Sequence, residues 1–144
     1  MRLVGKDEYG IDLCIADYQF PDAEDARLRT SWLVIAGTAC SEEGAWSFRW
    51  QALTPPEARS LATWLETSRA GDHLRFTEPN LSFALVERTE RETVLRIGLD
   101  LEFSPPWRKQ TRAGDPYTIT TRLCAAALPT AVADWTAETA RFPG

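Results

Sequence analysis

The sequence predicts an α+β fold: a curved antiparallel β-sheet, or two packed sheets, with two helices, one central and one C-terminal. Segments of alternating apolar and polar residues follow one another through hairpin-length connections, which favour antiparallel pairing. Two further segments, near 54–71 and 128–142, space their apolar residues at helical intervals. The 144 residues, 44% hydrophobic and 26% charged, fit a single domain over residues 1–144.

The first half of the chain is predicted to contain three strands. Alternation predicts one strand over 11–20, and a charged loop or short helical turn follows over 21–29. Segment 31–39 is apolar on both faces, which predicts a central strand covered on both sides. Residues 42–44 are a hairpin signal, and segment 46–50 then alternates as a half-buried strand does.

The central helix has a clear predicted start. Thr54 can cap the free amides, Glu57 can complete a capping box, and the prolines between them suit the first turn. Its buried stripe consists of Ala58, Leu61, Ala62 and Leu65. Gly71 is predicted to end it.

The second half of the chain predicts further strands and the C-terminal helix. Strand patterns cover 74–76, 81–85 and 117–123. The clearest alternation runs over 95–103 and must stop at the prolines that follow, because proline cannot extend a strand ladder. Apolar residues spaced by three and four positions predict a helix over 128–142.

The net charge of −5 is concentrated near the N-terminus. Residues 1–25 hold seven acids and two bases, whereas residues 26–144 hold fourteen of each. With a pI near 4.9, the chain lacks the basic residues that a nucleic-acid-binding protein needs. An acidic patch can instead attract a basic protein partner, although most surface charge only solvates loops.

Neither a membrane segment nor a metal site is expected. No run approaches about 18 apolar residues, and the charged start is not a secretory signal. Cys14, Cys40 and Cys124 lie far apart without metal-ligand spacing, so we expect buried, reduced thiols and a cytoplasmic protein. Nucleotide-binding motifs are absent, and we expect no cofactor.

Catalytic patterns are weak. His73 is the one histidine and lies in a predicted turn, so it is expected to be an exposed loop residue. Asp100 and Glu102 would share one face of a strand, about 6.6 Å apart, and could divide acid and base work on a glycoside. The simpler interpretation is that they form the wet side of a half-exposed strand.

Six tryptophans are many for this length. Trp32, Trp46 and Trp135 are expected in the core, and Trp64 at its border. Trp50 and Trp107 are harder to bury, and exposed rings can stack on sugars or anchor a protein interface. Trp107 could instead fold back over the end of the sheet.

Several segments give the chain a resemblance to the WapI-like bacterial immunity proteins, from about residue 10 to the C-terminus. These segments are 17–22 (DYQFPD), 31–35 (SWLVI), 46–48 (WSF), 76–83 (FTEPNLSF), 101–107 (LEFSPPW) and the closing Arg141-Phe142-Pro143. The most specific are the FxEPNLxF and LEFxPPW patterns, although neither is a chemical motif. The resemblance implies a non-catalytic protein that neutralises a bacterial toxin domain by binding it in the cytosol.

A nuclease toxin is usually basic where it meets phosphates, so acidic residues on an immunity protein could cover that surface. The first candidate surface consists of Asp17, Asp22, Glu24 and Asp25, with Tyr18 and Phe20 as anchors. The second is the hairpin pair Glu42 and Glu43, and Trp107 is a further candidate anchor. Two alternatives stay open: a carbohydrate or small-ligand binding domain that uses Trp50 and Trp107, and a small hydrolase that uses Asp100 and Glu102.

Overall fold

The computed structural model describes residues 1–109 and 114–144, and its strands form two four-stranded antiparallel sheets. Sheet A has the order β1-β2-β3-β4 and sheet B the order β5-β6-β7-β8, so strands pair with their neighbours in sequence. The strands of sheet A are Arg2–Val4, Gly10–Tyr18, Leu33–Ser41 and Gly44–Leu53; those of sheet B are His73–Arg75, Leu81–Arg88, Glu92–Leu99 and Tyr117–Cys124. The two-sheet form of the predicted α+β fold is confirmed.

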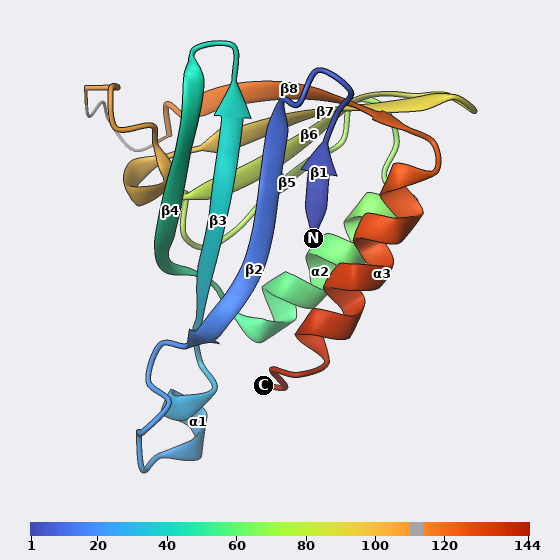
Figure 1. The fold of residues 1–144 in the computed structure, drawn as a ribbon. Helices are drawn as coiled ribbons and strands as arrows, with labels where there is room; N and C mark the ends of the chain where they lie inside the picture. The colour runs from blue at the N-terminus through green and yellow to red at the C-terminus, as the bar shows by residue number, and fades with distance from the viewer. Residues whose placement is uncertain (110–113) are drawn as a thin grey trace.

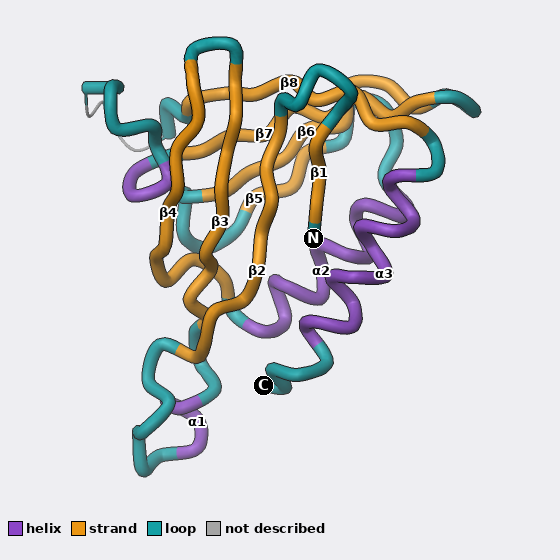
Figure 2. The backbone as a smooth tube through the Cα atoms, in the orientation of Figure 1, coloured by secondary structure: helices purple, strands orange, loops and turns teal. Residues whose placement is uncertain are grey.

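The helices of the described residues lie outside the two sheets. Their bounds are Ala26–Arg29 for α1, Pro55–Thr67 for α2 and Ala127–Thr139 for α3, with a 3-10 turn, η1, at Leu101–Phe103. The strands of sheet A run across those of sheet B, and α2 and α3 lie side by side next to β1 (Figure 1). Figure 2 shows α1 at the opposite end of sheet A from the β3–β4 hairpin. None of the described helices is long and apolar enough to cross a membrane.

The core lies between the crossed sheets and continues under the helices. Ile35 on β3 and Leu95 on β7 are fully buried, and so is Trp135 on α3. The indole of Trp135 donates a hydrogen bond to the carbonyl of Ala58, 2.7 Å away, which ties α3 to α2. The Trp46 indole likewise donates to the carbonyl of Phe103 at 2.9 Å. Polar atoms of both rings are therefore satisfied inside the core.

The predicted start of α2 is confirmed in detail. The hydroxyl of Thr54 accepts a hydrogen bond from the amide of Glu57, and the Glu57 carboxylate accepts one from the amide of Thr54. The other carboxylate oxygen of Glu57 accepts from both the amide and the hydroxyl of Thr77, each at 2.7 Å. One side chain therefore caps α2 and also fixes the segment that follows β5.

The helix α2 ends at Thr67, four residues before the predicted stop at Gly71. The guanidinium of Arg88, on β6, donates to the carbonyls of Leu65 and Glu66 at 2.8 and 3.0 Å. This long-range contact satisfies carbonyls at the end of the helix, and sequence pattern alone does not reveal it. Gly71, at φ +95°, instead forms part of the turn into β5.

Two strand predictions need correction. The strand expected over 95–103 ends at Leu99, because Asp100 caps η1 and Leu101 takes a φ of +50°. β3 is central in sheet A, as predicted, but one of its two faces is not covered. Val34 and Ala36 point away from the core and are partly exposed, whereas the inward residues Leu33 and Ile35 are buried. The strand β1 carries no alternation long enough to predict.

Several burial predictions also need correction. Cys14 and Cys124 are exposed and Cys40 is half-buried, since all three occupy outward positions on their strands. Trp32 is half-buried because it lies just before β3, outside the region covered by sheet B. Trp46 and Trp135 are buried and Trp64 is half-buried, as expected.

We expect Glu57→Gln to lower the free energy of unfolding at pH 7 by about 1 kcal/mol, because it weakens the cap of α2 and the contact with Thr77. Burial opposes ionisation of this carboxyl, but the hydrogen bonds from Thr54 and Thr77 outweigh burial and lower its pKa. The stabilisation is therefore present above the ordinary pKa of 4.5 and is lost as the pH falls through the lowered value.

Urea unfolding of both proteins from pH 7 to pH 3 measures this effect, and the difference between them should shrink below about pH 4.5. Glu66→Gln is the matched control, since Glu66 is an exposed residue of the same helix and its carboxylate accepts no hydrogen bond from a described residue. A difference that stays constant with pH would show that the Glu57 charge contributes nothing.

Candidate functional site

The segment between β2 and β3 projects from the end of sheet A as an arm, defined here as residues 19–32 (Figure 1). Asp25 caps α1 by accepting a hydrogen bond from the amide of Arg27 at 2.8 Å. The guanidinium of Arg29 donates to the carbonyls of Ala23 and Glu24, at 2.9 and 3.1 Å. These bonds give the arm a defined conformation although α1 buries no residue.

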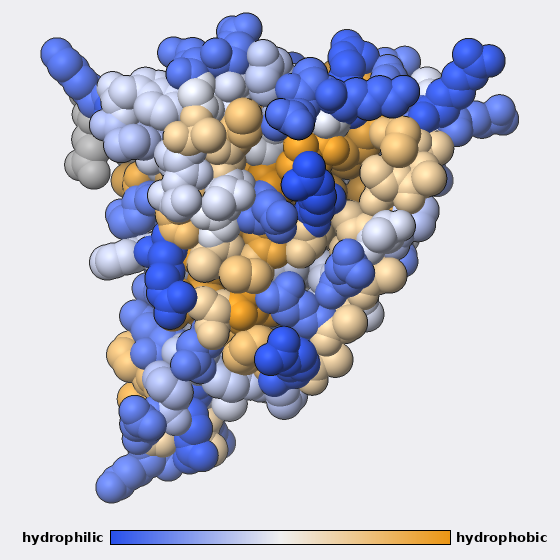
Figure 3. Space-filling model, in the orientation of Figure 1, coloured by the Kyte–Doolittle hydropathy of each residue, from blue (hydrophilic) through white to orange (hydrophobic). Residues whose placement is uncertain are grey.

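The arm exposes apolar and acidic side chains together. Phe20 is 40% exposed and Leu28 is 47% exposed, which is unusual for large apolar residues. Asp22, Glu24 and Asp25 are exposed on the same arm. Figure 3 shows this end of the molecule as largely hydrophilic with a few apolar atoms among the polar ones. The structure therefore brings together four of the residues singled out in the sequence: Phe20, Asp22, Glu24 and Asp25.

Two other candidates, Asp17 and Tyr18, lie at the base of the arm. The Tyr18 ring packs edge-on against Phe142, with centroids 5.4 Å apart, and its hydroxyl donates to the carbonyl of Pro143. Burial raises the pKa of Tyr18. Tyr18 therefore holds the C-terminal tail against β2, while the exposed Asp17 accepts a hydrogen bond from the Tyr18 amide.

The β3–β4 hairpin carries the second candidate surface. The hydroxyl of Tyr117 donates to the Glu43 carboxylate at 2.5 Å and lies 2.9 Å from the hydroxyl of Ser41. Burial and the Glu43 carboxylate raise the pKa of Tyr117, which keeps this hydroxyl protonated as a donor. Trp107 packs edge-on against Trp46, 5.2 Å between centroids. The hairpin is thus fixed to sheet B through Tyr117.

Trp107 folds back over the end of the sheet and stays 43% exposed. A Cβ on Gly44 would lie 3.2 Å from its ring, so the ring rests on the hairpin backbone. The hairpin surface therefore combines Glu42 and Glu43, both exposed, with the edge of Trp107. β3 separates this surface from the arm by nine residues, about 27 Å at the usual rise per residue.

The carboxylate pair of the hydrolase alternative does not form. Asp100 is 3% exposed and accepts hydrogen bonds from the amides of Leu101 and Gly114, at 2.8 and 2.7 Å. Glu102 is exposed on η1 and accepts only a long bond from Asn80 at 3.4 Å. The two do not share a strand face, because the strand ends before them. Both carboxylate oxygens of Asp100 are thus bonded to backbone amides.

The two tryptophans of the sugar-binding alternative lie apart. Trp50 is 50% exposed on β4, whereas Trp107 rests on Gly44 at the start of the same strand. Six residues of strand separate these positions, about 20 Å. The rings therefore do not form one stacking platform for a single sugar.

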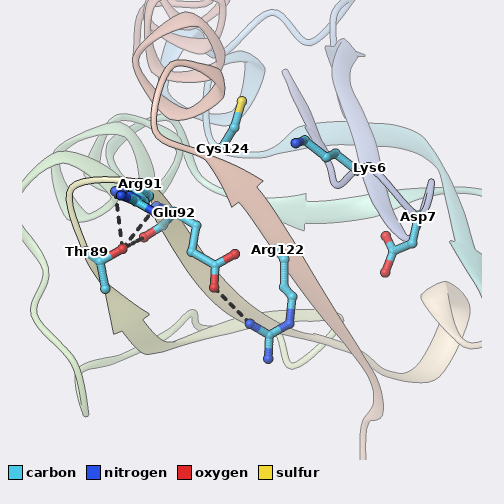
Figure 4. A pocket seen from close by; sticks show the side chains of 7 residues that line it. All are labelled: Lys6, Asp7, Thr89, Arg91, Glu92, Arg122 and Cys124. Carbon is cyan, nitrogen blue, oxygen red and sulfur yellow. Dashed lines mark hydrogen bonds and ion pairs between the residues drawn. The ribbon is translucent and has the colours of Figure 1, made fainter.

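A surface hollow of about 520 Å³ lies where the β1–β2 turn meets β8 and the β6–β7 turn (Figure 4). Glu92 and Arg122 form an ion pair across it at 2.9 Å, and Lys6 and Asp7 face it from the β1–β2 turn. Cys124 lies at its edge without a histidine near it, since His73 belongs to β5. The hollow thus lacks a cysteine–histidine pair. Sequence reasoning missed it because three distant segments build it.

A larger apolar groove of about 800 Å³ runs between α2, α3 and the β6–β7 turn. Leu65, Leu128 and Val132 line it, and the guanidinium of Arg88 at its edge already caps α2. Among residues 1–109 and 114–144, no group of three or more His, Cys, Asp or Glu is arranged to hold a metal ion.

The comparison with protein families decides the class. A family model described as the immunity protein WapI-like family matches residues 2–143, nearly the whole chain. The chain belongs to the immunity protein WapI-like family. No curated protein and no solved structure matches it.

Membership of the WapI-like family confirms the resemblance of the sequence segments and indicates a toxin-neutralising binding role. Immunity proteins of this kind are generally non-catalytic. The family match does not name the toxin, and it assigns no contact residue.

We expect Asp100→Asn to lower the free energy of unfolding by about 1–3 kcal/mol, because an amide cannot accept from both the Leu101 and Gly114 amides as a carboxylate does. Glu102→Gln should change it by less than about 0.5 kcal/mol. Urea unfolding of the matched pair measures both values. Equal stabilities would contradict the anchoring role of Asp100.

Proposed function

We propose that this WapI-like protein neutralises a basic toxin domain by binding it through the arm, without chemistry of its own. The observation that supports this surface is the exposure of Phe20 and Leu28 on a short, internally bonded arm. Exposed aromatic and aliphatic side chains on a preorganised segment are typical anchors of protein interfaces, because little conformational entropy is lost when they bind.

The charge on the arm supports a basic partner, although less strongly than the sequence suggested. Asp22, Glu24 and Asp25 contribute three negative charges, and Arg27 and Arg29 contribute two positive ones. Arg29 donates to backbone carbonyls of the arm but stays exposed, so its positive charge counts at the surface and the arm has a net charge of −1. Charges of this kind mainly accelerate association with an oppositely charged partner.

The hairpin surface is the second candidate. It also combines acids with an aromatic ring, Trp107, but Glu43 is already bonded to Tyr117. A carboxylate that already accepts a hydrogen bond from a tyrosine hydroxyl has fewer free acceptor positions for a cationic side chain of a partner than the exposed acids of the arm have. We therefore assign the main contact to the arm and none to the hairpin.

The first test is binding and protection. The protein should co-purify with the C-terminal domain of a toxin encoded directly upstream of its gene, and co-expression should restore growth of cells that produce this domain. A correctly folded protein that neither binds nor protects against that toxin domain contradicts the proposed function itself.

Reversing two acids of the arm, with Asp22→Lys and Glu24→Lys together, should slow association at low salt by about tenfold or more and flatten its salt dependence. Asp25 stays unchanged, because it caps α1. The matched control reverses the exposed Glu66 and Glu87, which changes the net charge equally. Stopped-flow or surface-based kinetics over a range of NaCl concentrations measure the effect. If the control slows association as much, only the net charge matters and the arm is not the contact.

Removing the anchors, with Phe20→Ala and Leu28→Ala, should raise the dissociation rate by about tenfold or more while the association rate stays nearly unchanged. The fold should survive, because neither residue is buried. A double reversal of Glu42 and Glu43 to Lys separates the two surfaces. Loss of affinity only in that variant would assign the contact to the hairpin and not to the arm.

A further inference from the structure

The outer face of sheet A, meaning the side that points away from sheet B, is apolar at its centre and uncovered. Its central side chains are Cys14 on β2 and Val34 and Ala36 on β3. These positions carry small apolar residues where the solvated face of an antiparallel sheet normally carries polar ones. Figure 3 views the molecule from this side and shows pale and apolar atoms over β2 and β3, with hydrophilic residues around them.

The apolar centre is confined to these three positions, because Thr38, Ser47 and Gln51 on the same face are polar. The sequence pattern of β3 favours a strand covered on both faces, yet the described residues cover only the inner face. Within the described residues, no helix or strand lies over the outer side of β3, and α1 projects away from the sheet (Figure 1).

The charges around this centre are self-complementary. β2 contributes Asp12 and Asp17, and β4, on the other side of β3, contributes Arg49. Asp12 lies 4.0 Å from Arg2, while Arg49 and Asp17 form none of the ion pairs between described residues. The two acids and two bases cancel, so the face has no net charge with which to attract a basic toxin.

We propose that this outer face is the interface between two copies of the chain. A two-fold axis along β3 places β2 of one copy over β4 of the other. Arg49 then lies over the partner's Cys14, between the partner's Asp12 and Asp17, because Arg49 and Cys14 both pair with Ala36. An axis across the strands would instead place Arg49 on the partner's Arg49. Charge thus selects the first arrangement, an aligned packing of two sheets.

The area predicts a weak dimer. The three long strands β2, β3 and β4 at the usual spacing, over the length of β2, give about 450 Å² per copy, or about 900 Å² in total. Stable dimers bury at least about 1,200 Å², and smaller interfaces are transient. We therefore expect dissociation in the micromolar range, and the arm stays free to bind a toxin in the dimer.

Sedimentation equilibrium of the purified protein from about 1 to 500 µM should show a concentration-dependent dimer. Ala36→Lys should abolish it, because two lysines would meet on the axis. Thr118→Lys, an exposed strand position of sheet B, is the matched control and should leave it intact. Circular dichroism verifies that both variants are folded.

The charge arrangement has its own test. Arg49→Glu should raise the dimer dissociation constant at least tenfold, and Asp17→Arg in the same chain should restore it. A short bismaleimide should join two chains through Cys40, which lies on β3 near the axis, in a Cys14→Ser and Cys124→Ser background. With Cys14→Ser and Cys40→Ser, the remaining Cys124 should give no covalent dimer.

A protein that stays monomeric up to 500 µM would overturn the proposal, and so would a dimer that Ala36→Lys leaves unchanged. A monomeric chain whose Ala36→Lys variant loses capture of the upstream toxin domain would assign this face to the toxin. Loss of toxin binding through the arm variants alone would leave the dimer unaffected, so the two proposals fail separately.

Discussion

Burial of the inner face of β3 against sheet B is the contact on which the other parts of the molecule depend. Leu33 and Ile35 are fully excluded from water on this face, and each such side chain contributes about 1.5–3 kcal/mol. Gly37, the next inward residue after Ile35, has no room for a side chain, since a Cβ would lie 2.8 Å from the ring of Phe48. β3 is also hydrogen-bonded on both edges, so its position fixes the arm at one end and the hairpin at the other.

The parts of the fold that the sequence predicts are those determined by local pattern. Alternation of apolar and polar residues located seven of the eight strands. Thr54 and Glu57 predicted the start of α2, because a capping box forms between residues only three positions apart. What pattern does not reveal depends on distant partners. The end of α2 depends on Arg88, which lies twenty-one residues beyond Thr67. The end of β7 depends on the two hydrogen bonds that Asp100 accepts from backbone amides. The alternating sequence pattern continues to residue 103, although the strand itself ends at Leu99.

The candidate site was predictable in its residue types but not in its geometry. Acidic residues in a predicted loop indicated this candidate surface, whereas the hydrogen bonds of Arg29 and the exposure of Leu28 depend on the folded loop. Tyr18 belongs to the same sequence segment, yet it holds the C-terminal tail. The apolar pattern of β3 predicted that both faces of the strand are covered. Within the described residues of a single chain, only the inner face is covered.

The absence of any buried residue in α1 has a consequence for evolution. Substitutions at the tip of the arm create no cavity, so they escape the stability cost that restrains most positions of a small protein. The hydrogen bonds from Arg29 go to the backbone carbonyls of Ala23 and Glu24, and a carbonyl is present whichever residue type occupies these two positions. The side chains displayed on the arm can therefore change during evolution while the two sheets and the helices α2 and α3 stay the same.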